Sequence, residues 1–293
     1  MKRVFSIALP LAVIAGLIGL FWYLVAGKEI PVLQPSGEIA AAQYNLFVFT
    51  TALSLVVVVP VFTLLAYFAV KYRAGNAKAN YDPEWSENRL LESLWWGIPI
   101  CIIGILGIVI VQTSHGLDPS KELSGGKPLE VQVVALQWKW LFIYPEQNIA
   151  TLNHLNIPLD RPVRFALTSD APMSGFWIPA LGSQVYAMSG MESQLNLKAT
   201  KTGAYTGYTT NINGEGYAKM TFTTNVTSQT EFDAWTKKAS ASDTTMDQAA
   251  YDELAKPKSI QDERTYKLAD AKLFETIVNK YGHSQSGHGE HES

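Results

Sequence analysis

Residues 129–144 read LEVQVVALQWKWLFIY. In the first half of this stretch apolar side chains recur at every second position, at Val131, Val133 and Ala135, and the second half is rich in aromatic side chains. Alternation with a period of two and an excess of β-branched and aromatic residues are typical of β-strands. The stretch therefore predicts strands at the start of a β domain.

Shorter strand-like runs follow, separated by turns that contain Pro, Gly, Asp and Asn. They occupy residues 162–167, 176–178, 194–197, 205–210 and 219–223. Several short strands at such spacing favour a Greek-key sandwich or barrel.

The pattern changes to helix after Ser228. Residues 228–231, Ser-Gln-Thr-Glu, have the form of a capping box that opens a helix. Apolar residues then recur at helical spacings, at Phe232, Trp235, Ala249, Leu254, Leu273, Ile277 and Tyr281. We expect short helices that pack on the outside of the sandwich.

Three apolar runs precede the β region, at residues 5–24, 46–70 and 94–111, and none contains Asp, Glu, Lys or Arg. Each has about the 20 residues needed to cross about 30 Å of hydrocarbon. The second and third runs predict a transmembrane hairpin. The first run is either a retained helix or a secretory signal, since basic residues precede it but its apolar core is long for a signal.

The loop at residues 71–89 carries two lysines and two arginines, whereas the segment before the second run carries Lys28 alone. Short basic loops stay on the cytoplasmic side of a membrane. Everything after His115 is therefore expected on the periplasmic side. These patterns divide the chain into residues 1–27 (signal or membrane helix), 28–116 (hairpin), 117–228 (periplasmic β domain), 229–281 (helical region) and 282–293 (His-rich disordered tail).

Composition excludes several classes of function. The 293 residues are 47% hydrophobic and 17% charged, and the formal net charge is -3. Without a cluster of basic residues, nucleic acid is not expected as a partner. The single cysteine, Cys101, lies in the third apolar run. The periplasmic region therefore cannot hold a disulfide, a dithiolate copper site or a cysteine-based zinc site.

Several motifs, in one consistent order, resemble subunit II of the respiratory haem-copper oxidases. They are ESLWWGIP at 92–99, QWKWLFIYPE at 137–146, GFWIP at 175–179, GAYTG at 203–207 and NGEGYAKM at 213–220. The resemblance runs from about Pro31 to Tyr281 and points in particular to ubiquinol oxidases of the cytochrome bo type. It implies a cupredoxin-like fold for the periplasmic domain, carried on N-terminal transmembrane helices.

In cytochrome c oxidases the corresponding domain holds two copper ions through two histidines, two cysteines, a glutamate and a methionine. The soft thiolates bridge the two ions. Aligned by the resemblance, the ligand positions of this chain are Ser174 and Tyr217 for the histidines, Thr209 and Asn213 for the cysteines, Asn211 for the glutamate and Met220 for the methionine. We call these six the copper-equivalent positions. They predict that the chain binds no copper.

The resemblance then implies a quinol donor in place of cytochrome c. Ubiquinol would be oxidised in subunit I, which in this family carries the haems and one copper. Subunit II would itself have no catalytic residue and no cofactor. Its expected partners are oxidase subunits I, III and IV and membrane lipid, and its expected location is the bacterial inner membrane.

Three further residues follow from the resemblance. Glu92 begins the third apolar run on the cytoplasmic side, where the family has a carboxylate near a proton channel of subunit I; it either takes up protons or is a charge at a helix end. Trp138 matches the tryptophan that receives the electron from cytochrome c in copper-bearing relatives. Without copper, Trp138 and Trp140 are assigned to an aromatic patch that packs, or that rests on the membrane surface or on subunit I.

The histidines of the chain are not expected to form a metal site. His283, His288 and His291 lie in the tail, which is expected to be disordered before it is a metal site. His154 is expected at the surface or in an interface.

Two other functions remain open. One is subunit II of a cytochrome c oxidase, which the missing thiolates oppose. The other is a lone membrane-tethered cupredoxin-like assembly factor, which would not need the Glu-x-x-Trp-x-x-x-Pro pattern at residues 92–99.

Overall fold

A computed structural model describes residues 16, 19–20, 22–23, 26–27, 30–73, 76, 84, 87–258 and 262–282 of the chain. The chain divides into two units, Met1–Gln34 and Pro35–Ser293. In the first unit a short 3-10 helix, η1, spans Pro31–Leu33. The expectation for the first apolar run, at residues 5–24, falls mostly outside the described residues.

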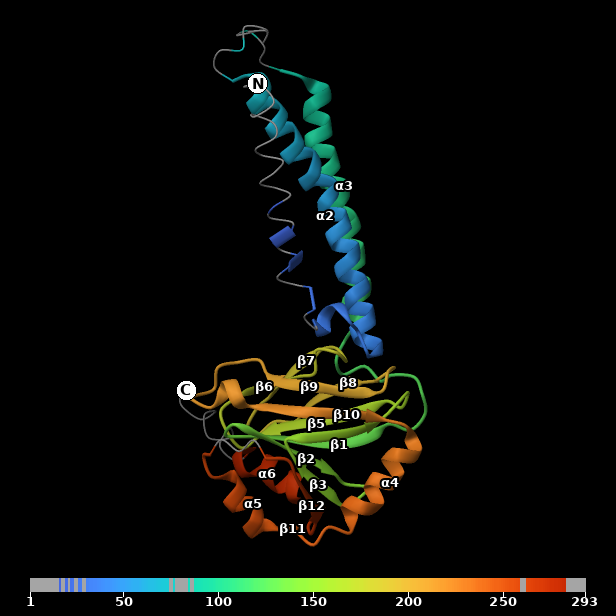
Figure 1. The fold of residues 1–293 in the computed structure, drawn as a ribbon, viewed down its shortest axis with the longest axis vertical. Coiled ribbons are helices and arrows are strands. Elements are labelled where there is room, and N and C mark those ends of the chain that lie inside the picture. Colours follow the sequence, from blue (N-terminus) through green and yellow to red (C-terminus); the bar gives the residue numbers. More distant parts are fainter. Residues whose placement is uncertain are drawn as a thin grey trace, which may run out of the picture. The chain divides into compact units, whose positions relative to one another are not determined.

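The second unit begins with two long apolar helices, α2 at Glu38–Lys71 and α3 at Arg89–Gly116 (Figure 1). Each contains a window of mean hydropathy 2.5, and no residue of either window is buried inside the chain. Length and composition therefore allow both helices to cross a membrane, as the second and third apolar runs predict. Both helices extend beyond those runs by several residues at each end, except that α2 ends one residue after its run.

After α3 the chain forms two β-sheets. The seven-stranded sheet has the order β11-β12-β3-β2-β1-β5-β8, and the five-stranded sheet has the order β4-β10-β9-β6-β7. The first comprises β11 Thr245–Met246, β12 Arg264–Leu268, β3 Ile149–Leu152, β2 Lys139–Tyr144, β1 Leu129–Leu136, β5 Val163–Ser169 and β8 Ser193–Leu197. The second comprises β4 His154–Pro158, β10 Thr221–Thr227, β9 Gly203–Thr209, β6 Ser174–Trp177 and β7 Gln184–Ala187.

The main core lies between the two sheets. It contains alternate side chains of β1, including Val131 and Val133, and an aromatic cluster around Phe176. The rings of Phe176 and Phe222 stack with their centroids 5.1 Å apart, and the Trp140 ring meets Phe176 edge-on at 5.3 Å. Two sheets facing one core confirm the β sandwich predicted from the alternating strands.

A second apolar cluster lies on the other face of the seven-stranded sheet. Here α5, at Gln248–Ala255, and α6, at Leu273–Gly282, contribute buried side chains that include Leu254 and Ile277. The expectation of helix alone after Ser228 is wrong in one respect. Strand β12 pairs antiparallel with β3, so the C-terminal region also extends the sheet.

Helix α4, at Gln229–Ser240, begins as the sequence predicts. The Ser228 side chain accepts a hydrogen bond from the Glu231 backbone N–H, and the Glu231 carboxylate accepts one from the Ser228 N–H at 2.9 Å. This reciprocal pair satisfies two backbone donors that the first turn of a helix would otherwise leave free.

The start of α2 is hydrogen-bonded to the β sandwich. Backbone N–H groups of Ser36, Glu38 and Ala40 donate to carbonyls of the sandwich at 2.8, 3.0 and 3.1 Å. Gly37 forms an isolated β-bridge with Ala199. A Cβ on Gly37 would lie 2.5 Å from the Leu181 carbonyl oxygen, so the close approach requires glycine.

Candidate functional site

Three of the copper-equivalent positions are joined through one amide. The Asn213 Nδ2 donates to the Ser174 hydroxyl at 2.7 Å and to the Met220 sulfur at 3.4 Å. Ser174 opens β6, whereas Asn213 and Met220 belong to the connection between β9 and β10. The fold therefore brings these side chains together although about forty residues separate the two segments, as the aligned motifs imply.

Asn211 also links the connection after β9 to the region of β6. Its Oδ1 accepts hydrogen bonds from the Gly175 N–H at 2.6 Å and from the Thr209 hydroxyl at 3.3 Å, and its Nδ2 donates to the Met173 carbonyl. The residue equivalent to a copper-binding glutamate thus links the loop to β6 by hydrogen bonds alone. Tyr217, the sixth position, lies on the short 3-10 helix η2 at Tyr217–Lys219, and its side chain is exposed.

Trp138 packs against the loop that connects β9 to β10. Its indole N–H donates to the Asn213 carbonyl at 3.3 Å. A Cβ on Gly214 or Gly216 would lie 2.9 or 2.4 Å from the indole ring, so the loop can rest on Trp138 because both positions are glycine. Trp138 itself has a positive φ of 63°, at the turn between β1 and β2.

The side chains at the copper-equivalent positions do not suit a copper pair. They supply a phenol, two hydroxyls, two amides and one thioether, whereas bridging two copper ions requires soft thiolates. The Asn213 Oδ1 is buried without a hydrogen-bond partner, but a single amide oxygen is a hard, neutral donor. Within the described residues, no three His, Cys, Asp or Glu side chains gather closely enough to hold a metal ion.

Comparisons with known proteins identify the family of this chain. Residues 145–227 match the family described as cytochrome c oxidase subunit II, periplasmic domain, and residues 240–285 match the COX aromatic rich motif. The chain is 43% identical to the cytochrome bo(3) ubiquinol oxidase subunit 2 of Pseudomonas putida over 92% of this chain and 86% of that protein. The chain belongs to the ubiquinol oxidase subunit 2 family. The resemblance stated from the motifs is thus confirmed.

Other relatives extend the family. The ubiquinol oxidase subunit 2 of Acetobacter aceti is 43% identical over 88% of this chain and 85% of its own length. The quinol oxidase subunit 2 of Bacillus cereus is 38% identical over 78% of this chain and 80% of its own. Among solved structures, the periplasmic domain of cytochrome oxidase subunit II (CoxB) of Bradyrhizobium japonicum aligns with a TM-score of 0.37 and 23% identity, over 39% of this chain and 96% of that one.

Family membership and the observed fold together define the overall architecture of the chain. The chain is a membrane-anchored protein of the ubiquinol oxidase subunit 2 family, with two apolar helices followed by a cupredoxin-like periplasmic domain and short C-terminal helices.

The Trp140 side chain is fully buried between the sheets. This position agrees with the assignment of Trp140 to packing and excludes the alternative that its ring rests on the membrane or on subunit I. Trp138 is partly buried and packs against the same core. The Trp140 ring points inward because all six residues of β2 are buried: one face of the strand meets the main core and the other meets the cluster formed with the C-terminal helices.

His154 is also buried, contrary to the expectation of a surface residue. Its Nδ1 lies 3.1 Å from the Leu152 carbonyl oxygen, and its Nε2 lies 3.2 Å from the Thr265 hydroxyl. Burial lowers the pKa of the His154 imidazole below its usual value. Because both ring nitrogens already have partners, the imidazole links the two sheets and leaves neither nitrogen open to a metal ion. His283, His288 and His291 lie outside the described residues.

Glu92 lies in the first turn of α3 with an exposed side chain. The helix begins with Asn88, whose side chain accepts a hydrogen bond from the Leu91 N–H at 3.1 Å. A carboxylate in the first turn is favoured by the helix dipole, which accounts for Glu92 structurally and leaves its role in proton uptake a prediction.

Two clusters were missed by the sequence patterns. Asp170 accepts hydrogen bonds from Tyr251, Lys280 and Tyr281, which are 81 to 111 residues away along the chain. Lys139 is fully buried and donates to the carbonyls of Lys256 and Lys258 at 2.9 and 3.0 Å. No local pattern marks either cluster, because each depends on pairing between distant segments. A lysine in the middle of a run of strand-forming residues, as in Trp138-Lys139-Trp140, is the one available signal.

Proposed function

We propose that this chain is subunit II of a proton-translocating ubiquinol:oxygen oxidoreductase of the bacterial inner membrane and has no active site of its own. The observation that carries the proposal is the hydrogen-bonded network of Ser174, Asn211, Asn213 and Met220 at the copper-equivalent positions. Relatives that span most of the chain carry the name ubiquinol oxidase subunit 2, which agrees with it.

A copper pair in this domain would be the port through which cytochrome c delivers electrons. With amides and hydroxyls at the ligand positions, the chain offers no redox group there. Electrons would then enter from ubiquinol within the membrane, in subunit I, together with its haems and one copper. Subunits III and IV and membrane lipid complete the expected set of partners.

The contribution of this chain would be mechanical. The start of α2 is hydrogen-bonded to the sandwich at Ser36, Glu38 and Ala40, and Glu38 forms an ion pair with Lys198 at 3.3 Å. A sandwich held at the end of a membrane helix can cover the periplasmic face of a partner without swinging away from it. We expect this connection to stabilise subunit I.

Glu92 is the candidate for a chemical contribution. A carboxylate at the cytoplasmic end of a membrane helix can accept a proton from water and pass it to a channel in a neighbouring subunit. Its exposed side chain is free to face such a partner.

The test is purification of the detergent-solubilised complex through an affinity tag on this chain, followed by haem and metal analysis. Oxygen uptake is measured with ubiquinol and, separately, with reduced cytochrome c. The proposal expects one copper for every two haems and oxygen uptake from ubiquinol alone. Three coppers with oxidation of cytochrome c would make the chain a cytochrome c oxidase subunit, and absence of haem would make it a lone assembly factor.

A further inference from the structure

Methionines gather at one edge of the five-stranded sheet. The chain has six methionines, and three of them, Met173, Met188 and Met191, lie in the loop before β6 and in the turn after β7. Met173 is 45% exposed, Met191 is 48% exposed and Met188 is partly exposed, whereas Met220 and Met246 are buried. Three thioethers at this edge are therefore accessible from solvent.

The strand register places Met173 opposite Met188. Strand β6 pairs antiparallel with β7, and in this ladder Ser174 is opposite Ala187. The side chains of this pair are fully buried in the sandwich. One step further along, Met173 and Met188 are opposite each other, and alternation along a strand turns their side chains to the outer face. Directly opposite residues have Cβ atoms about 4.5–5.5 Å apart, so the two thioethers can meet.

A tight turn keeps Met191 near Met188. The Met191 N–H donates to the Met188 carbonyl at 3.4 Å, and Gly190 between them has a positive φ of 73°. This is the pattern of a type II turn, whose first and last Cα atoms lie within about 7 Å of each other. A methionine side chain is unbranched and rotates about three bonds, so the three sulfur atoms are able to converge on one ion.

The backbone that carries these methionines is already fixed by other contacts. The Ser189 hydroxyl donates to the Ala171 carbonyl at 3.0 Å and thereby joins the turn to the loop before β6. A Cβ on Gly190 would lie 3.1 Å from Tyr281, so the end of α6 packs against the turn. Such prior ordering reduces the entropy lost when a ligand binds.

The donor atoms select monovalent copper. Thioether sulfur is a soft ligand, which suits Cu(I), whereas Mg²⁺, Ca²⁺ and Mn²⁺ prefer oxygen. Three neutral donors leave the charge of the ion uncompensated, which favours one positive charge over two. The Lys280 ammonium, adjacent in sequence to Tyr281, would repel a cation, but it is paired with the Asp170 carboxylate at 2.7 Å.

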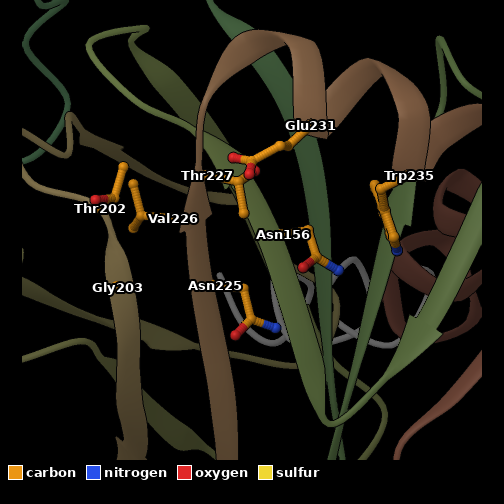
Figure 2. Close-up of a pocket in the computed structure, with 8 residues that line it drawn as sticks. All are labelled: Asn156, Thr202, Gly203, Asn225, Val226, Thr227, Glu231 and Trp235. Atoms are coloured by element: carbon orange, nitrogen blue, oxygen red, sulfur yellow. The ribbon is translucent and has the colours of Figure 1, made fainter.

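The groove beside α4 offers no comparable set of donors. Figure 2 shows its lining, which includes Asn156, Asn225 and Trp235 and contains no sulfur and no imidazole. Its one carboxylate, Glu231, already caps the helix through Ser228. The methionine cluster is therefore the better candidate for a metal site.

We propose that Met173, Met188 and Met191 bind one Cu(I) ion on the periplasmic domain. The site uses none of the copper-equivalent positions. Neutral donors at an open surface hold the ion reversibly, so washing with a chelator leaves only the copper expected in subunit I. The site does not depend on whether ubiquinol or cytochrome c supplies electrons, and it therefore stands or falls separately from the proposed function.

The test is anaerobic titration of Cu(I) into the full-length chain in lipid nanodiscs, in competition with a chromogenic Cu(I) chelator. X-ray absorption at the copper edge then identifies the ligand atoms. We expect one Cu(I) per chain with sulfur ligands, and binding about tenfold weaker in each of Met173→Leu, Met188→Leu and Met191→Leu. Leucine keeps the approximate volume of methionine and removes the sulfur.

The matched control is Met246→Leu, which removes a buried thioether from the second apolar cluster and should leave Cu(I) binding unchanged. Hydrogen exchange of the β6 and β7 amides shows that the site variants keep the wild-type fold. The proposal is overturned if the chain takes up no Cu(I), if the ligands are nitrogen atoms such as the tail histidines would supply, or if the site variants bind as tightly as the control.

Discussion

The Tyr251 hydroxyl donates a hydrogen bond to the Asp170 carboxylate at 2.6 Å and thereby joins α5 to the end of β5. The Lys280 ammonium forms an ion pair with the same carboxylate at 2.7 Å, and the Tyr281 hydroxyl is a third donor. The Asp170 side chain is 1% exposed. Burial raises the pKa of this carboxyl, but the hydrogen bonds from Lys280, Tyr251 and Tyr281 outweigh it and hold the pKa below its usual value.

Asp170→Asn removes the charge that these three donors share. We expect the helix α6 to open more easily by about 2 kcal/mol, or roughly thirtyfold, because hydrogen bonds to a charged group are worth more than neutral ones. Hydrogen exchange of the amides of Leu273–Gly282 measures this opening. Asp252→Asn, an exposed aspartate on α5, is the control. Equal exchange in both variants would show that Asp170 does not hold α6.

Gly37→Ala should loosen the start of α2. A Cβ at this position would meet backbone atoms of Leu181 at 2.5 and 2.8 Å, and backbone cannot move aside as a side chain can. We expect a cost of about 1–3 kcal/mol, as in other overpacked positions. Faster exchange of the Ser36, Glu38 and Ala40 amides would report it. Gly97→Ala in α3, where a Cβ meets nothing within 4 Å, should have no such effect.

Lys139 should make the stability of the folded chain depend on pH in the alkaline range. Burial lowers the pKa of the Lys139 ammonium from 10.5 to about 8, with a smaller contribution from the charge of Lys258. Between these two values the unfolded chain holds a proton that the folded chain has released, so stability rises with pH. The apparent midpoint of thermal unfolding should therefore gain a positive contribution from pH 8 to 10.5 that Lys139→Met lacks. Lys267→Met, with an exposed lysine, should keep the wild-type profile.

Asn211→Ala tests the network at the copper-equivalent positions. The change removes the acceptor for the Gly175 N–H and the donor to the Met173 carbonyl, so the loop after β9 should detach from β6 at a cost of about 1–2 kcal/mol. Exchange of the Gly175 amide reports the change. Ile212→Ala, at an adjacent side chain that is 78% exposed, serves as the comparison. Protection of Gly175 that survives in Asn211→Ala would contradict the assigned role.

Glu92→Gln tests proton uptake. If Glu92 passes protons to subunit I, the purified oxidase should turn over several-fold more slowly with ubiquinol and translocate fewer protons per electron. Oxygen uptake and acidification of the medium by proteoliposomes measure the two quantities. Glu122→Gln, beyond the other end of α3, is the control. Unchanged turnover and unchanged pumping would assign Glu92 to the helix end alone.

Local patterns determined a large part of this protein. Apolar runs free of charge predicted α2 and α3, since any helix of that length and composition is able to cross a membrane. The capping box at Ser228 and Glu231 predicted where α4 begins, because both partners lie within one turn. The identities of the residues at the ligand positions predict the lack of a copper pair without any knowledge of geometry, since amides and hydroxyls are not thiolates.

Tertiary structure alone decided which distant segments pair and pack together. Residues 264–268 form strand β12 because they pair with β3, which lies more than a hundred residues earlier in the chain. Trp140 and Lys139 are buried because both faces of β2 are covered. Whether a polar side chain such as Asp170 or Asn156 is buried depends on which elements cover it. Such pairings depend on non-local contacts, because strand preference reflects the neighbours on the sheet more than the local sequence.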